Sequence, residues 1–240
     1  MSTLLLRLAG PLQAWGTDSR FNTRQTGTVP SKSGVIGLLA AALGLRRDAD
    51  LSRLRKLRFG IRTDQEGTLL RDFQTVHVKK GKGPEVTQRY YLCDAVFLVG
   101  LESDDDPFLR ELAEALRAPV WALFLGRRSC PPTQPLVLGI RGLPLDEALA
   151  LESWQASERY REEWFRRHPG TLPELPVLTD ADGSGYGRTV ASDDPLSFDQ
   201  RDRRYGFRAV EGKRSVTPPD ASGGPGLSTE HDAFAELEGA

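Results

Sequence analysis

Apolar and polar positions along the first 63 residues follow two different periods. The run "TLLLRLA" (3–9) predicts a strand, and "RFGIRT" (58–63) alternates as a second strand. Between them, "SGVIGLLAAALG" (33–44) is apolar on nearly every face, which predicts a buried helix that ends at Gly44. The chain therefore begins as strand, helix, strand.

A long hairpin is predicted next. We expect "LLRDFQTVHV" (69–78) and "YYLCDAVFLVGL" (90–101) to be its two arms. The intervening "KKGKGPEVTQR" (79–89) is the expected tip, because it combines lysines with two glycines and a proline. The sequence therefore predicts a thumb-like hairpin over about residues 69–92.

A second helix and a closing strand complete the predicted domain. "DPFLRELAEALRAP" (106–119) has an Asp106 cap, Pro107 at the first helical position and an apolar face. "VWALFLG" (120–126) predicts a strand. The order strand, helix, strand, strand, helix, strand indicates an α+β, ferredoxin-like domain over residues 1–142, an arrangement that RNA-recognition modules share. "RYYLCDAVF" (89–97) lacks their run of stacking aromatics, so any RNA would be bound through loops.

The remainder of the chain is less clearly patterned. We expect a smaller, mostly β region over 143–214, with a helix within 152–170 and a strand at "RRYGFRAV" (203–210). Glycine, proline and acidic residues dominate from 215 to 240, which predicts a disordered tail.

Composition narrows the class of protein. Of the 240 residues, 27% are charged and 39% hydrophobic, and no run approaches the roughly 20 apolar residues of a membrane span. The start "MSTLLLRLAG" lacks a basic region, so we expect a cytoplasmic protein without a membrane partner. Cys93 and Cys130 have no metal-ligand or redox spacing, and we expect neither a metal nor a cofactor.

Charge is divided unevenly between the two halves. Residues 1–100 hold 16 Lys and Arg against 8 Asp and Glu, whereas residues 101–240 hold 16 against 25. This division favours a polyanion-facing first half and an acidic second half that contacts basic partners or solvent.

The segment "GTVPSKSG" (27–34) resembles a phosphate-binding loop before a helix, but it fails the P-loop pattern. That pattern needs glycine just before the lysine and five residues earlier, where this chain has Ser31 and Thr26. Two interpretations stay open. The helix start could bind an anion through Ser31, Lys32 and Ser33, or one of the serines could simply be an N-cap.

Two long loops are candidates for single-stranded RNA binding. The first, residues 10–30, contains Trp15 and Phe21 as stacking faces with Arg20 and Arg24 as phosphate or base partners. The second is the hairpin tip, whose cations are Lys79, Lys80, Lys82 and Arg89. The alternative is that the aromatics fill the core and the lysines only solubilise the hairpin.

Four segments in order resemble the CasD family of type I-E CRISPR systems. They are "LLRLAGPLQAWG", "RQTGTVPSKSGVIGLLAAALGL", "YYLCDAVF" and "FLGRRSCPPTQPLVLG", which together cover about residues 4–140. The resemblance implies a crRNA-binding subunit of the Cascade antiviral ribonucleoprotein complex, with a RAMP-type, RRM-like domain that holds the 5′ handle of the guide. It implies partners as well: the CasC backbone subunit, the CasA large subunit, other Cascade subunits, and target DNA through the complex.

The same resemblance assigns roles to particular residues. The pocket for RNA phosphate would consist of Ser31, Lys32 and Ser33. The handle path would be lined by Gln13, Trp15, Arg20 and Arg24, and the thumb would contribute Arg89, Lys79, Lys80 and Lys82. Arg127 and Arg128 could bind RNA or brace the fold, and we favour RNA.

Catalysis is the alternative hypothesis. Related proteins of type I-C systems cleave repeat RNA without a metal, and here His77, Tyr90, Tyr91 and Lys79 could supply an acid, a base and a cation. In type I-E systems a separate endonuclease, CasE, makes the cut. We therefore expect a non-catalytic protein, with His77 as the candidate if it is an enzyme.

Overall fold

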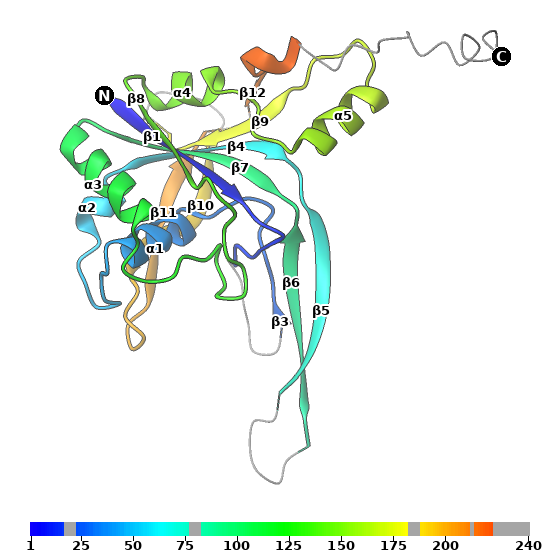
Figure 1. Ribbon diagram of the computed structural model, residues 1–240. Coiled ribbons are helices and arrows are strands. Elements are labelled where there is room, and N and C mark those ends of the chain that lie inside the picture. Colours follow the sequence, from blue (N-terminus) through cyan, green and yellow to red (C-terminus); the bar gives the residue numbers. More distant parts are fainter. Residues whose placement is uncertain (17–22, 77–82, 182–187, 212–213, 223–240) are drawn as a thin grey trace, which may run out of the picture.

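The structure is a computed structural model that describes residues 1–16, 23–76, 83–181, 188–211 and 214–222. It is a mixed α+β fold in which helices cover a central sheet and a long two-stranded hairpin extends away from that body (Figure 1). The predicted α+β class is therefore confirmed. No helix among the described residues is long and apolar enough to cross a membrane.

The central sheet has six strands in the order β12-β9-β4-β7-β1-β8, and every neighbouring pair is antiparallel. In chain order, the strands are β1 (Ser2–Ala9), β4 (Arg58–Gln65), β7 (Val96–Ser103), β8 (Val137–Arg141), β9 (Leu175–Thr179) and β12 (Arg214–Val216). Residues on both sides of position 142 thus share one sheet.

The expected tail is partly ordered. Strand β12 pairs with β9, and the 3-10 helix η1 (Pro219–Ser222) buries Ala221. The predicted disorder is therefore wrong for residues 215–222, because the edge of the sheet continues into them. The rest of the predicted tail lies outside the described residues.

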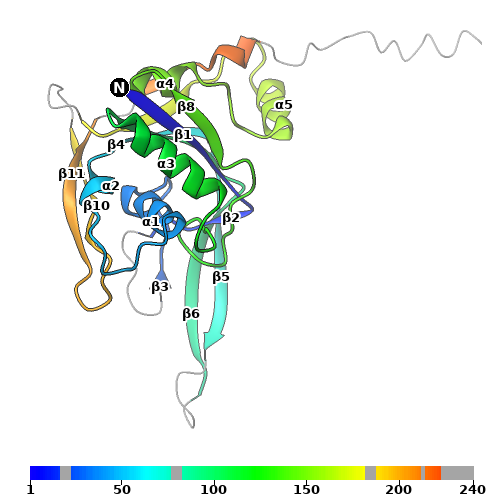
Figure 2. The same ribbon diagram turned by 60° about the vertical axis from the view of Figure 1, so that its left-hand side comes forward.

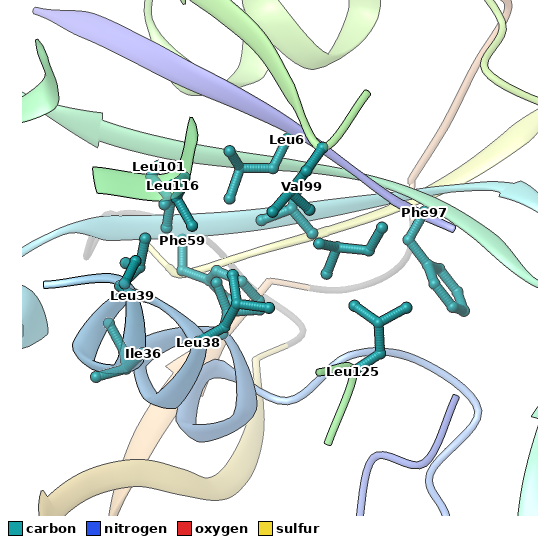
Figure 3. Packing of buried hydrophobic residues seen from close by; sticks show 14 of the residues in the cluster. Leu6, Ile36, Leu38, Leu39, Phe59, Phe97, Val99, Leu101, Leu116 and Leu125 are labelled. Carbon is teal, nitrogen blue, oxygen red and sulfur yellow. The ribbon is translucent and has the colours of Figure 1, made fainter. Parts of the chain in front are cut away.

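Alternate residues of each strand separate the core into two layers, as a period of two requires. Leu4, Leu6 and Leu8 of β1 pack with helices α1 (Lys32–Ala42) and α3 (Asp106–Arg117) on one face. Leu5 packs on the opposite face with α4 (Leu145–Leu151). Figure 3 shows the first layer, in which strand side chains meet those of α1 and α3.

The sequence predicted both long helices correctly, with one correction at a cap. Helix α1 is buried, as its all-round apolar pattern indicates, and Gly44 follows it with a φ of 72°. Helix α3 has Pro107 in its first turn, but the N-cap is Asp105 rather than Asp106, since Asp105 accepts a hydrogen bond from the Phe108 N–H. The remaining helices, α2 (Ser52–Arg55) and α5 (Glu158–Arg167), are short.

The predicted strand over residues 120–126 is wrong. The N–H groups of Val120 and Trp121 donate to carbonyls at the end of α1, those of Ala42 and Ala41, instead of to a strand. The closing strand of the unit is β8, which pairs with β1. An apolar composition alone did not distinguish a segment that caps a helix from a segment in the sheet.

The hairpin is made by β5 (Thr68–Val76) and β6 (Glu85–Cys93), which pair in register from Thr68–Cys93 to Val76–Glu85. The predicted second arm is therefore wrong: part of the expected tip is strand, and the apolar run breaks at Asp94, which has a φ of 57°. The following segment is β7 in the central sheet. Two short strands, β2 (Leu12–Gln13) and β3 (Thr23–Arg24), flank β6 at the base of the hairpin.

A second two-stranded unit is formed by β10 (Thr189–Ser197) and β11 (Arg204–Val210). Figure 2 shows this pair at the edge of the molecule beside α1, on the other side of α1 from the β5–β6 hairpin. The alternation in "RRYGFRAV" therefore predicted β11 correctly.

Candidate nucleic-acid interface

A groove of about 1500 Å³ lies between helix α1, the segment 121–128 and the β10–β11 unit. Its cationic lining consists of Arg24, Arg46, Arg47, Arg127, Arg128, Arg201 and Arg203. The acidic residues in its wall are Asp48, Asp193 and Asp199, and the aromatic ones are Trp15, Trp121, Phe124, Phe198 and Tyr205. Among the residues that the structure describes, seven arginines thus meet three aspartates around a groove that also carries aromatic rings.

The charges of the groove are not cancelled by its carboxylates. Asp193 is already bonded to Arg208, which lies behind the wall. Arg46 contacts Asp48 at 3.5 Å, but the Arg46 side chain is 84% exposed, so solvent screens that pair. The groove therefore presents an excess of positive charge beside planar rings, a combination suited to the phosphates and unstacked bases of single-stranded nucleic acid.

The start of helix α1 binds a carboxylate of the protein itself, that of Asp193. Ser31 is the N-cap, with its Oγ accepting a hydrogen bond from the Gly34 N–H at 3.2 Å. The Lys32 N–H donates to the Asp193 carboxylate at 2.7 Å. A helix N-terminus favours negative charge, and here the Asp193 carboxylate occupies the place that the anion-site interpretation assigns to a phosphate. The N-cap interpretation of Ser31 is confirmed.

Lys32 itself is buried, and its charge is already paired within the protein. Its side chain is 7% exposed, and its Nζ lies 2.8 Å from Asp180 Oδ2. Arg208 joins both carboxylates, at 2.6 Å from Asp180 and 2.6 Å from Asp193. The charge of Lys32, which we predicted to bind an RNA phosphate, is instead paired with Asp180 directly after β9, and the Lys32 backbone N–H ties α1 to Asp193 of β10. Ser33 lies half-buried in the groove wall and stays a candidate.

The Arg208 side chain stays charged inside this network. Burial by itself lowers the pKa of the guanidinium, but hydrogen bonds and attraction from Asp193 and Asp180 outweigh it and raise the pKa above its ordinary value. Two cations and two carboxylates therefore fix one wall of the groove against the body.

Gln13 and Trp15 also belong to the core. Gln13 is fully buried; its Nε2 donates to the Ala95 carbonyl at 2.6 Å and its Oε1 accepts from Trp15 Nε1 at 3.0 Å. Trp15 is 1% exposed and lies against Gly34, where an added Cβ would approach the indole ring to 2.9 Å. The structure thus places both side chains in the core, as the alternative for Trp15 held, although Trp15 also forms part of the groove wall.

Arg127 braces the base of the hairpin. Its guanidinium donates to the carbonyls of Tyr90 at 3.0 Å and Arg24 at 2.9 Å, and it lies 4.7 Å from the centre of the Tyr91 ring. Of the two roles that the sequence left open for Arg127, the observed contacts are those of a residue that braces the fold. Arg128 is exposed and lines the groove, so RNA binding remains a prediction for it.

Arg24 and Arg89 lie opposite each other where β3 pairs with β6. Arg24 is exposed and lines the groove. The Nε of Arg89 is buried, and it is the one buried side-chain nitrogen or oxygen of the described residues without a hydrogen-bond partner. Both remain candidates for RNA contact.

The other predicted site residues lie outside the described residues. They are Arg20 in the first loop and His77, Lys79, Lys80 and Lys82 at the hairpin tip. Among the residues that the structure describes, no three histidines, cysteines or acidic residues are grouped so that they could hold a metal ion.

Most of the residues that line the groove were not predicted from the sequence. The missed residues are Arg46, Arg47, Trp121, Phe198, Arg201, Arg203 and Tyr205. Short arginine clusters in "LRRDAD" and "QRDRRYGF" are the signal that could have indicated two of these segments. Nothing local indicates that the two clusters face each other, since 154 residues or more separate them.

Comparisons with known proteins agree with one another. The family model described as CRISPR-associated protein (Cas_Cas5) matches residues 3–211. The CRISPR system Cascade subunit CasD of Escherichia coli (strain K12) is 43% identical over 159 residues, covering 58% of this chain and 70% of the relative.

Solved structures show the same similarity along most of the chain. A structure described as a CRISPR RNA-guided surveillance complex contains a chain with 34% identity and a TM-score of 0.73, covering 90% of this chain and 91% of that one. A second, described as a crystal structure of a Cas protein, has 38% identity and a TM-score of 0.67, covering 90% and 95%. The resemblance to CasD seen in the sequence is confirmed, and this chain belongs to the Cas5 family of CRISPR-associated proteins.

Proposed function

We propose that this protein is a non-catalytic subunit of a Cascade surveillance complex and that it binds the 5′ handle of the crRNA in the arginine-lined groove. The observation that carries the proposal is the groove itself, where seven arginines and several aromatic rings converge from separate segments of the chain. The similarity to the Cascade subunit CasD and to a chain of an RNA-guided surveillance complex supports the choice of ligand.

The fold would position this groove in the manner of a ferredoxin-like RAMP domain. The strand order β8-β1-β7-β4, with α1 and α3 joining the strands as a split βαβ unit, supports that assignment. The β5–β6 hairpin is then the thumb. Arg89, with its unpaired Nε at the hairpin base, and the lysines of the tip would contact the guide near the handle.

The proposed partners follow from assembly in Cascade. The protein would dock the CasC backbone and the CasA large subunit, and it would meet target DNA only through the complex, where guide pairing reads the sequence. The protein would act in the cytoplasm, where the complex would assemble around its guide RNA.

The enzyme alternative is a metal-independent repeat endonuclease with His77 as its acid or base. Such an enzyme needs a proton donor, a proton acceptor and a cation around the scissile phosphate. The groove offers arginines, which bind phosphate well but are poor proton carriers because they stay protonated. Binding without cleavage is therefore the favoured function.

The test is incubation of the purified protein with end-labelled repeat RNA in chelator, with retention and fragment length followed over time. Retention of intact RNA that weakens in Arg128→Ala and Arg203→Ala variants is expected. Arg110→Ala is the matched control, because Arg110 is an exposed arginine on α3 that does not line the groove. Cleavage at one position, lost in His77→Ala, would establish the nuclease instead.

A further inference from the structure

Strand β11 carries two aromatic side chains on its outer face. Tyr205 is 43% exposed and Phe207 is 76% exposed. Both extra residues in the β10–β11 register fall on β10, so β11 keeps a strict period of two. Its alternate residues Arg208 and Val210 face the body, where they are nearly buried. Tyr205 and Phe207 therefore point to the same side, away from the core.

The two rings continue the groove outward. Tyr205 lines the groove together with Arg201 and Arg203, which are exposed cations. Phe207 is the next residue on the same face of β11, beyond the groove lining. Phe207 is 76% exposed and gains little from burial, and with Tyr205 it forms an exposed aromatic pair next to the arginines of the groove.

We propose that Tyr205 and Phe207 form a stacking platform for two consecutive nucleotides of single-stranded RNA leaving the groove across β11. Same-face residues two apart on a strand are roughly 7 Å apart, a spacing that unstacked bases of an extended strand can match. Stacking accepts any base, because every base has a π-face, while the arginines at the groove end hold the phosphates. This inference rests on the proposed function, since it extends the path of the same RNA.

Charge favours nucleic acid over a protein as the occupant of this face. The aromatic pair is continuous with a wall rich in arginine, and a polyanion threading that wall passes over Tyr205 before it reaches Phe207. A partner protein that covers the rings instead is an outcome the experiment must be able to show.

The experiment measures RNA affinity and base position together. Phe207→Leu and Tyr205→Leu keep an apolar side chain but remove the ring, and Val190→Ala is the control because Val190 is 70% exposed on β10 of the same unit. Each leucine variant should bind single-stranded repeat RNA about tenfold more weakly, with an unchanged salt slope because no phosphate contact is lost. Val190→Ala should bind like the wild type.

A second readout changes the RNA instead of the protein, so its first measurement needs only the wild-type protein. Abasic nucleotides are placed at one position of the RNA at a time. Removing the base that stacks on Phe207 should weaken wild-type binding about tenfold and should leave Phe207→Leu binding unaffected. Photo-crosslinks from 5-iodouridine at that position should map to Phe207.

The failures of the two proposals are distinguishable. If Phe207→Leu binds RNA like the wild type while Arg128→Ala weakens binding, the platform is overturned and the groove function stands. If Phe207→Leu keeps RNA affinity but loses assembly with the other Cascade subunits, the face is a protein surface and the platform is likewise overturned. If RNA binding responds to neither the arginines nor the rings, the proposed function itself fails.

Discussion

The backbone N–H of Lys32 donates a hydrogen bond to the carboxylate of Asp193, 161 residues further along the chain, at 2.7 Å. Asp193 of β10 thus occupies the N-terminus of α1, and Arg208 of β11 binds both Asp193 and Asp180, so these contacts fix β10–β11 to the rest of the fold. The segment that resembles a phosphate-binding loop therefore connects α1 to β10. The position of this wall of the groove depends on the ion pairs among Lys32, Asp180, Asp193 and Arg208.

The Asp193→Asn substitution should destabilise the protein. The neutral amide would leave the buried Arg208 with only Asp180 as an ionic partner and would remove negative charge from the helix end. We expect the free energy of unfolding to fall by about 3 kcal/mol, measured by urea titration.

The matched control for that variant is Asp202→Asn. Asp202 also pairs with an arginine of β11, Arg204, but both side chains are 62% exposed, so the change should stay within about 1 kcal/mol. Equal effects at the two positions would mean that the buried network does not hold β10–β11 in place.

Lys32 should matter for stability and not for RNA contact. Because Lys32 is paired with Asp180 inside the protein, Lys32→Met should lower the free energy of unfolding and leave the salt dependence of RNA binding unchanged. Arg128→Ala should do the opposite and reduce the slope of log K against log salt by about one unit, since one phosphate contact is lost. A reduced slope in the Lys32 variant would return it to the RNA site.

Features that are determined within one segment could be predicted from the sequence, whereas features that depend on a distant partner could not. The period of "TLLLRLA" and the all-round apolarity of "SGVIGLLAAALG" depend on the segment itself, and β1 and α1 lie where they were predicted. The segment 120–126 has the composition of a strand, yet its amides bond to the end of α1. Whether these amides bond to a strand or to a helix end depends on which backbone carbonyls lie nearby, and the composition of the segment does not specify that.

The candidate site shows the same division. Arg24, Ser33 and Arg128 of the predicted site line the groove, but the side chains of Lys32, Gln13 and Trp15 are buried. Their partners Asp180, Ala95 and Gly34 come from other elements, so their burial follows from tertiary packing. Arg46 and Arg203 approach one groove from segments that no sequence motif connects.

Asp105 offers a test of pH dependence. The pKa of this N-cap carboxyl lies below its ordinary value of 3.8, mainly because the carboxylate accepts a hydrogen bond from the Phe108 N–H. A hydrogen bond from Arg53 lowers the pKa further. The stabilisation is therefore present above pH 3.8 and is lost as the pH falls through the lowered pKa. Asp105→Asn keeps a good N-cap but removes the charge. Its thermal unfolding temperature should lie below that of the wild type at neutral pH, and the gap should close in acid; a gap that is constant with pH would exclude the charge as the cause.

Arg62 and Asp64 form an ion pair in which both side chains are fully buried. Two hydrogen bonds of 2.7 Å join the guanidinium to the carboxylate, and Arg62 also donates to the carbonyls of Leu149, Glu152 and Ser153. The pair therefore attaches the end of α4 and the residues after it to the central sheet.

Removing both members together should cost less stability than the sum of the two separate removals. Asp64→Leu would leave a buried guanidinium without a counter-ion, and Arg62→Leu would leave a buried carboxylate, so each single variant should lose about 3–5 kcal/mol of unfolding free energy. In the double variant no charge of the pair remains buried, so its loss should be clearly smaller than the sum of the two single losses. Urea titration of all four proteins measures the coupling. Additive losses would contradict the pairing, because residues that neutralise each other cannot be removed independently.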